Sequence, residues 1–365
     1  MRWISVVLLA AGVIALQARR IPSRDQDERA IGGIEEYALV HGENIPGMGR
    51  GVSVFDEDEY IHAMGLTREA ISDINPLDPP LLVLFTSATE HTKYKFKDAV
   101  KMLKNPKFDN QKKTVIYIHG FLEGLFAESV KTVVNSYAAR KDHNIVILDW
   151  HAQAAPEYFL HAVKNVFKVG ADLGAVVVDM INSGLSLQRL HIVGHSLGGQ
   201  MAGVLGRTVQ KVSSGAILLP RISALDPAFP GFYGFPGAEH LTANDAEYVD
   251  VLHTDAGIYG APVDTGTVDF WPNGGLDPQP GCLINVCSHQ RSWWYWIESL
   301  EENAPNYFNS VVAKSWKDFK LGQVGQFDPD IVMGYSVPDG LSGSYYLQTN
   351  KRLPFARGAA GVVYE

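Results

Sequence analysis

One stretch of the chain combines residue types that could support covalent catalysis. Residues 190–193 (LHIV) form a short run of the kind that makes a buried strand, and G-H-S-L-G follows at 194–198. The small and apolar residues of 199–205 then favour a helix. A strand, a G-x-S-x-G turn and a helix in this order are typical of a nucleophile elbow, in which glycines flank a serine on a strained turn. Ser196 is therefore the predicted nucleophile.

A nucleophilic serine needs a histidine as general base and an acid that orients this histidine. In proteins with a nucleophile elbow, the chain order is serine, acid, histidine. Asp226 ends a short stretch (RISALD, 221–226) that predicts a strand, and a carboxylate at a strand end is well placed to orient a histidine. We predict Asp226 as the orienting acid. The other candidate acids are Asp250, Asp255 and Asp269.

His289 is the predicted general base. It follows Cys282 and Cys287, which we expect to form one small disulfide loop. A histidine on a loop pinned in this way would be held in place without being buried, as a general base must be. The alternatives are His240, in a polar turn, and His253, which we interpret as structural together with Thr254 and Asp255.

Backbone N–H groups that could stabilise an oxyanion are predicted at two positions. Residues 113–118 (KTVIYI) predict a strand that stops at His119-Gly120-Phe121. Beside a nucleophile elbow, such a loop supplies one donor, and the residue after the nucleophile supplies the other. We therefore assign the donors to Phe121 and Leu197. In the alternative interpretation, His119 and Gly120 only end a strand.

Alternating strand and helix patterns must position these groups. Residues 163–180 have helical spacing of apolar side chains, between two predicted strands. Apolar runs predict strands at 81–85, 113–118, 144–148, 190–193, 221–226 and 248–252. The alternation predicts an α/β fold, with a central, mostly parallel sheet that carries helices on both faces.

Length and composition divide the chain into three parts. Residues 1–18 have the pattern of a secretory signal peptide, so we expect an extracellular protein. Residues 19–78 are polar and turn-rich, which predicts a mobile arm, a propeptide or a poorly packed extension. The rest, residues 79–365, is long enough for one large domain with an ample core.

Charge and cysteine content exclude some classes of partner. The formal net charge of −9 argues against nucleic acid and against electrostatic docking on anionic membranes. Two cysteines alone do not complete a zinc site. We predict neither a metal nor a cofactor, and the sequence leaves the oligomeric state open.

Seven pieces of the chain, in family order, resemble the pancreatic lipase family, in particular its secreted insect neutral lipases and A1-type phospholipases. The pieces are IYIHGF (116–121), LDW (148–150), LHIVGHSLGGQMAG (190–203), ISALDPAFP (222–230), YVDVLHTDAG (248–257), VDFWPNGG (268–275) and PGCLINVCSH (280–289). The resemblance implies an α/β-hydrolase fold and hydrolysis of carboxylic esters of lipids at an aggregate or membrane surface. It implies a triad of Ser196, Asp226 and His289, with oxyanion donors at Phe121 and Leu197.

Short loops narrow the expected function within this family. Only residues 283–286 separate the two cysteines, where relatives that digest triacylglycerol typically carry a long lid, and the loop 256–267 is also short. Four residues cannot cover a cleft, so activation by opening of a lid is not expected. Short versions of both loops are typical of phospholipase members, so we predict a phospholipase. The alternatives are a triacylglycerol lipase or general esterase with the same triad, and a non-catalytic lipid-binding protein of the yolk type.

Two further features of the family are not expected here. The chain ends soon after the predicted domain, so we expect neither the family's C-terminal β-sandwich nor colipase binding. Some relatives bind calcium through acids in the segment that corresponds to residues 236–245. This chain keeps Asp245 but has Thr242 in place of an acid, which again predicts no metal.

Overall fold

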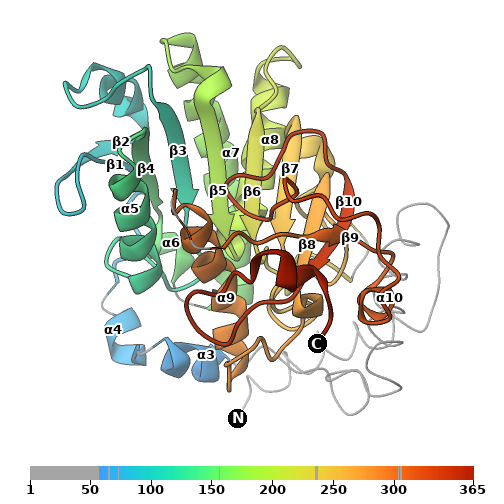
Figure 1. Cartoon of the computed structure of the whole chain (residues 1–365). Coiled ribbons are helices and arrows are strands. Elements are labelled where there is room, and N and C mark those ends of the chain that lie inside the picture. Colours follow the sequence, from blue (N-terminus) through green and yellow to red (C-terminus); the bar gives the residue numbers. More distant parts are fainter. Residues whose placement is uncertain are drawn as a thin grey trace.

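The computed structural model describes residues 57–365, apart from positions 65, 73, 156, 235, 236, 303 and 305 (Figure 1). The predicted signal peptide, residues 1–18, and residues 19–56 of the predicted extension lie outside the described residues. Within the described part, no helix is both long enough and apolar enough to cross a bilayer.

A ten-stranded sheet forms the centre of the domain, in the order β2-β1-β4-β3-β5-β6-β7-β8-β10-β9. The strands are β1 Leu81–Phe85, β2 His91–Lys95, β3 Lys113–Ile118, β4 His143–Asp149, β5 Leu190–His195, β6 Arg221–Leu225, β7 Tyr248–Leu252, β8 Val268–Pro272, β9 Val311–Val312 and β10 Gly343–Leu347. Neighbours from β4 through β10 are parallel, and β1, β2 and β9 join antiparallel. The mostly parallel sheet predicted from the sequence is therefore present.

Helices cover both faces of this sheet (Figure 1). The helices are α3 Glu57–Ala63, α4 Arg68–Ser72, α5 Glu128–Arg140, α6 His151–Ala154, α7 Val163–Asn182, α8 Leu197–Val212, α9 Asn285–Ser299 and α10 Trp316–Lys320. Short 3-10 or π turns span Phe96–Lys104, Tyr158–Ala162, Leu187–Arg189, Ala243–Asp245, Asn273–Gly275 and Gly358–Val362. Successive side chains of a strand point to opposite faces of the sheet, so a strand buried on both sides contributes side chains to two hydrophobic cores. In β3, Ile116 packs in the cluster that includes α7 and α8, and Tyr117 packs in the cluster that includes α5 and α9.

The parallel register brings the predicted site residues to one edge of the sheet. β3 pairs with β5, β5 with β6, and β6 with β7, all in the same direction. The carboxyl ends of these strands therefore lie at the same edge of the sheet, and three of the strands lead into the predicted site. Gly120 follows β3, Ser196 follows β5 and Asp226 follows β6.

The extension predicted over residues 19–78 differs from expectation where the structure describes it. Helices α3 and α4 lie inside it and pack against the domain. Tyr60 is buried in the main core cluster, and Ile61 and Ile71 form a smaller cluster with Ala155. The expectation of a mobile or poorly packed segment is therefore wrong for residues 57–72. The acidic residues around Tyr60 make this segment polar on average, so its composition does not indicate the short apolar face of the helix.

Candidate active site

The turn between β5 and α8 holds Ser196 in strained backbone. Its φ is +55°, in the left-handed region that costs a non-glycine residue about 1–3 kcal/mol. The flanking glycines are required by close backbone contacts. A Cβ on Gly194 would lie 2.2 Å from the carbonyl oxygen of Gly198, and a Cβ on Gly198 would lie 2.0 Å from the carbonyl oxygen of Ile118. The strand, the turn and the neighbouring β3 can approach this closely only without those side chains.

The backbone of Ser196 is also tied to the neighbouring strand. Its N–H donates to the carbonyl oxygen of Leu225 at 3.0 Å, and its own carbonyl oxygen accepts from the N–H of Ala228 at 3.1 Å. Leu197 begins α8, so no intrahelical hydrogen bond uses its N–H. The elbow thus places a hydroxyl and a helix N-terminus side by side at the edge of the sheet.

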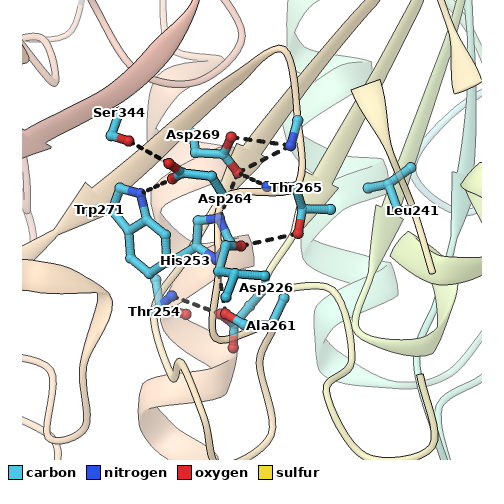
Figure 2. Close-up of polar contacts among 12 residues, drawn as sticks. Asp226, Leu241, His253, Thr254, Ala261, Asp264, Thr265, Asp269, Trp271 and Ser344 are labelled. Carbon is cyan, nitrogen blue, oxygen red and sulfur yellow. Dashed lines mark hydrogen bonds and ion pairs between the residues drawn. The ribbon is translucent and has the colours of Figure 1, made fainter. Parts of the chain in front are cut away.

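Asp226 and His289 form a buried pair. The Nδ1 of His289 donates to Oδ2 of Asp226 at 2.6 Å. The other carboxylate oxygen, Oδ1, accepts from the N–H groups of Thr254 at 2.7 Å and Asp255 at 3.1 Å. Figure 2 shows the contact of Thr254 with Asp226. Because these backbone donors occupy Oδ1, Oδ2 is directed to His289.

His289 differs from expectation in its local structure. It lies on α9 rather than on a loop, and it is 1% exposed. Cys282 and Cys287 form the expected disulfide, which joins the segment before α9 to its first turns. Burial lowers the pKa of His289 below its usual value, although Asp226 acts in the opposite direction. The imidazole is therefore neutral at neutral pH, as a proton acceptor must be.

A second buried histidine–acid pair lies behind this one. His253 Nε2 is 2.8 Å from Oδ1 of Asp269, its Nδ1 is 3.1 Å from the carbonyl oxygen of Ala261, and its ring stacks on Trp271 (Figure 2). Both ring nitrogens already face acceptors, so this pair anchors a loop. That loop carries Thr254, the donor to Asp226.

The remaining alternative residues also have other partners. Asp250 binds Arg221 at 2.7 Å, and the Nδ1 of His240 is 2.7 Å from the carbonyl oxygen of Leu241. Asp245 binds Arg207 at 2.7 Å and caps a turn with Thr242. Each contact fixes a local structure away from Ser196.

Ser196 and His289 line one small pocket of about 200 Å³, a volume that includes its open mouth. The lining residues are Tyr60, Phe121, Tyr158, Ser196, Pro230, Tyr259 and His289. The structure thus brings Ser196, His289 and Phe121 to one pocket, with Asp226 behind His289. A nucleophile, a base with its orienting acid, and a nearby loop are the parts needed for acyl transfer.

Comparison with known proteins identifies the family of the chain. A family model described as Lipase matches residues 68–355, more than half of the chain. The chain belongs to the lipase family. The match begins at the first residue of α4, ahead of the domain boundary predicted at residue 79.

Similar proteins include a pancreatic triacylglycerol lipase and several proteins named lipase member H. Pancreatic triacylglycerol lipase from Mus musculus is 31% identical over 293 residues, which are 70% of this chain and 60% of that protein. Lipase member H-A from Xenopus laevis is 35% identical over 220 residues, 58% of this chain and 46% of that protein. A solved hormone-sensitive lipase from a metagenome library has 16% identity and a TM-score of 0.24, over 53% of this chain and 56% of that chain. The chain spans about half the length of the curated relatives it matches.

Glu123 is a buried acid that the sequence analysis does not predict as part of the site. Its Oε2 accepts from the N–H of Gly120 at 2.7 Å and lies 3.5 Å from Nδ1 of His195, and its Oε1 accepts from Oγ of Ser129 at 2.7 Å. Burial alone would raise the pKa of Glu123, but His195 and the other donors outweigh burial and lower it to about 2. The only sequence signal is an acid placed three residues after Gly120.

Glu123 fixes the loop that carries the predicted donor Phe121. A Cβ on Gly120 would lie 3.0 Å from the Cβ of Ser196, so this loop lies directly against the elbow. His195, which contacts Glu123, belongs to the elbow itself, and its ring centroid lies 4.9 Å from that of His289. Glu123 therefore connects the donor loop to the segment that presents the nucleophile.

Replacing Glu123 with alanine should lower kcat with a smaller effect on KM. The Gly120 N–H would lose its acceptor, and an unmade buried hydrogen bond costs about 1–3 kcal/mol, or roughly 5- to 150-fold in rate if the loss falls on the transition state. Hydrolysis of p-nitrophenyl butyrate would report kcat and KM. Glu128→Ala, at an exposed acid on α5, is the matched control. Equal kcat values for the two variants would contradict the role of Glu123.

Asp255 is a second acid close to the pair. One ligand atom each of Asp226, Asp255 and His289 lies within 4.8 Å of the others. Burial raises the pKa of Asp255 well above its usual value, and the charge of Asp226 raises it further. Its Oδ2 accepts from the N–H of Tyr259 at 3.2 Å. Burial and the neighbouring carboxylate of Asp226 thus both favour the protonated form of Asp255.

Proposed function

We propose that this lipase is a secreted hydrolase of carboxylic esters in lipids, with glycerophospholipid as its preferred substrate. The observation that carries the proposal is the pocket shared by Ser196 and His289, with His289 bonded to Asp226 at 2.6 Å. Apolar and aromatic side chains complete the pocket, which suits an alkyl chain better than a charged substrate.

In the proposed mechanism, His289 removes the proton of Ser196 as the serine oxygen attacks the acyl carbonyl. Asp226 stabilises the resulting imidazolium, and the N–H groups of Phe121 and Leu197 bind the oxyanion. His289 then gives the proton to the leaving alcohol. Water, activated by the same histidine, cleaves the acyl-enzyme and releases the fatty acid.

Exposed apolar side chains support access to a lipid surface. Leu283, in the short disulfide loop before His289, is 97% exposed, and Ile284 beside it is also exposed. Phe159 and Leu160 follow the pocket-lining Tyr158 and are exposed as well. With a formal net charge of −9, contact with a lipid aggregate would rely on these apolar groups rather than on attraction to anionic headgroups.

Secretion is supported by two observations. A disulfide persists in oxidising compartments, and Cys282–Cys287 is bonded. The N-terminal residues 1–18 have the pattern of a signal peptide.

Triacylglycerol is the second candidate substrate, favoured by the 31% identity to the pancreatic triacylglycerol lipase. Fatty-acid release from phosphatidylcholine vesicles and from a triacylglycerol emulsion, with Ser196→Ala as the blank, distinguishes the two. Faster release from the vesicles supports the phospholipase proposal, and faster release from the emulsion overturns it. Release from neither, by a folded protein that a fluorophosphonate fails to label, would favour a non-catalytic lipid-binding role.

A further inference from the structure

Helix α3 supplies a wall of the pocket that the short disulfide loop cannot provide. Tyr60 on this helix lines the pocket with Ser196 and His289 and is 2% exposed. Its ring centroid lies 5.6 Å from that of Phe121 and 5.5 Å from that of Tyr259. The phenol ring is therefore packed between the predicted oxyanion loop and the loop opposite it.

The rest of α3 contacts the segments around the same pocket. The Oε2 of Glu57 accepts from the N–H of Tyr158 at 3.2 Å. Next to the helix end, Met64 Sδ accepts from the side-chain amide of Gln290 at 3.0 Å, on the residue after His289. Figure 1 shows α3 beside the start of α9. The short disulfide loop is thus not the only segment beside the cleft, because a helix from the N-terminal side lies there as well.

With α3 in this place, the pocket is small for a lipid. Its empty volume of about 200 Å³ includes the open mouth, so the enclosed space beside Ser196 is smaller still. An ester whose carbonyl reaches Ser196 must pass its acyl chain along Tyr158 and Tyr60. Because Tyr60 lines this space together with Ser196, we expect a short acyl group to enter it more readily than a long one, which would meet the phenol ring.

The described contacts of α3 lead to residues around the pocket rather than to the strands of the sheet. The helix has seven residues, and the ion pairs of Glu57 and Asp58 with Arg68 join it to α4 rather than to the sheet. Residues 75–79, which connect this segment to β1, are exposed. Displacing α3 would therefore break none of the described hydrogen bonds of the strand ladder or of the pair of Asp226 and His289.

We propose that Tyr60 determines the acyl-chain length that reaches Ser196: with α3 in place the lipase accepts short acyl groups, and longer chains require α3 to move. The proposal rests on the proposed function and concerns the specificity and regulation of the same site.

The test compares acyl-chain preference in the full-length protein. The ratio of kcat/KM for p-nitrophenyl decanoate to that for p-nitrophenyl acetate should rise at least about tenfold in Tyr60→Ala, since even one accommodated methylene can change specificity that much. Tyr60→Phe keeps the ring and should keep the ratio. His62→Ala, at an exposed position of the same helix, is the matched control. An unchanged ratio in Tyr60→Ala overturns the proposal. Tyr60→Leu repeats the test if alanine prevents folding.

A binding measurement separates this proposal from the proposed function. In a Ser196→Ala background, calorimetric titration with decanoate should show tighter binding when Tyr60→Ala is added. Equal affinity with and without Tyr60→Ala overturns the role of Tyr60, whatever the activity. Turnover that persists in Ser196→Ala instead overturns the proposed mechanism and leaves the binding result valid.

Discussion

Replacing Ser196 with alanine is expected to lower kcat for ester hydrolysis by roughly 10⁵- to 10⁶-fold, as loss of the nucleophile does in other serine hydrolases. The change removes the hydroxyl of a side chain that lines the pocket together with His289. Alanine has nearly the same strain as serine at a φ of +55°, so the fold should persist. Hydrolysis of p-nitrophenyl butyrate measures the loss, and thermal unfolding checks the fold.

The control for this prediction is Ser213→Ala, at the other end of α8. The Oγ of Ser213 makes only local contacts at the helix end, to the backbone of residues 210 and 217. Its loss should leave kcat unchanged. Labelling by a fluorophosphonate should disappear in Ser196→Ala and persist in Ser213→Ala. An adduct mapped to another residue would remove Ser196 from the proposed role.

The strands and the elbow could be predicted because their signals are local. β5 and β6 are apolar runs buried on both faces, and Gly194 and Gly198 mark a turn that only glycine permits. Once the strands are taken as parallel, their carboxyl ends must meet, so Ser196 and Asp226 come together. Each inference needed only a few neighbouring residues and one rule of sheet geometry.

Other parts of the site depend on contacts that are distant in sequence. The partners of Glu123 include His195, which is 72 residues away in the sequence. Nothing in the local sequence predicts this contact. The acidic residues around Tyr60 predict exposure, whereas its ring is packed against Tyr259. His289 was expected on an exposed loop because the disulfide suggested one, but α9 begins before Cys287.

Asp226→Asn is expected to lower kcat about ten-thousand-fold because it stabilises the wrong tautomer of His289. The shape of the site should stay the same. The N–H groups of Thr254 and Asp255 donate to Oδ1, so the amide oxygen of asparagine must take that position. Its NH₂ group then faces Nδ1 of His289, which has to accept. The ring proton moves to Nε2, and no lone pair remains to take the proton of Ser196.

Asp255→Asn tests whether the neighbouring acid shares this role. Burial and the charge of Asp226 favour the protonated form of Asp255, which an amide resembles in charge and in size. Asparagine can still accept from the N–H of Tyr259, and kcat should stay close to wild type. Steady-state kinetics of both variants on p-nitrophenyl butyrate make the comparison. If Asp255→Asn lowered kcat as much as Asp226→Asn, Asp226 could not be the sole orienting acid, and the assignment of that role would be contradicted.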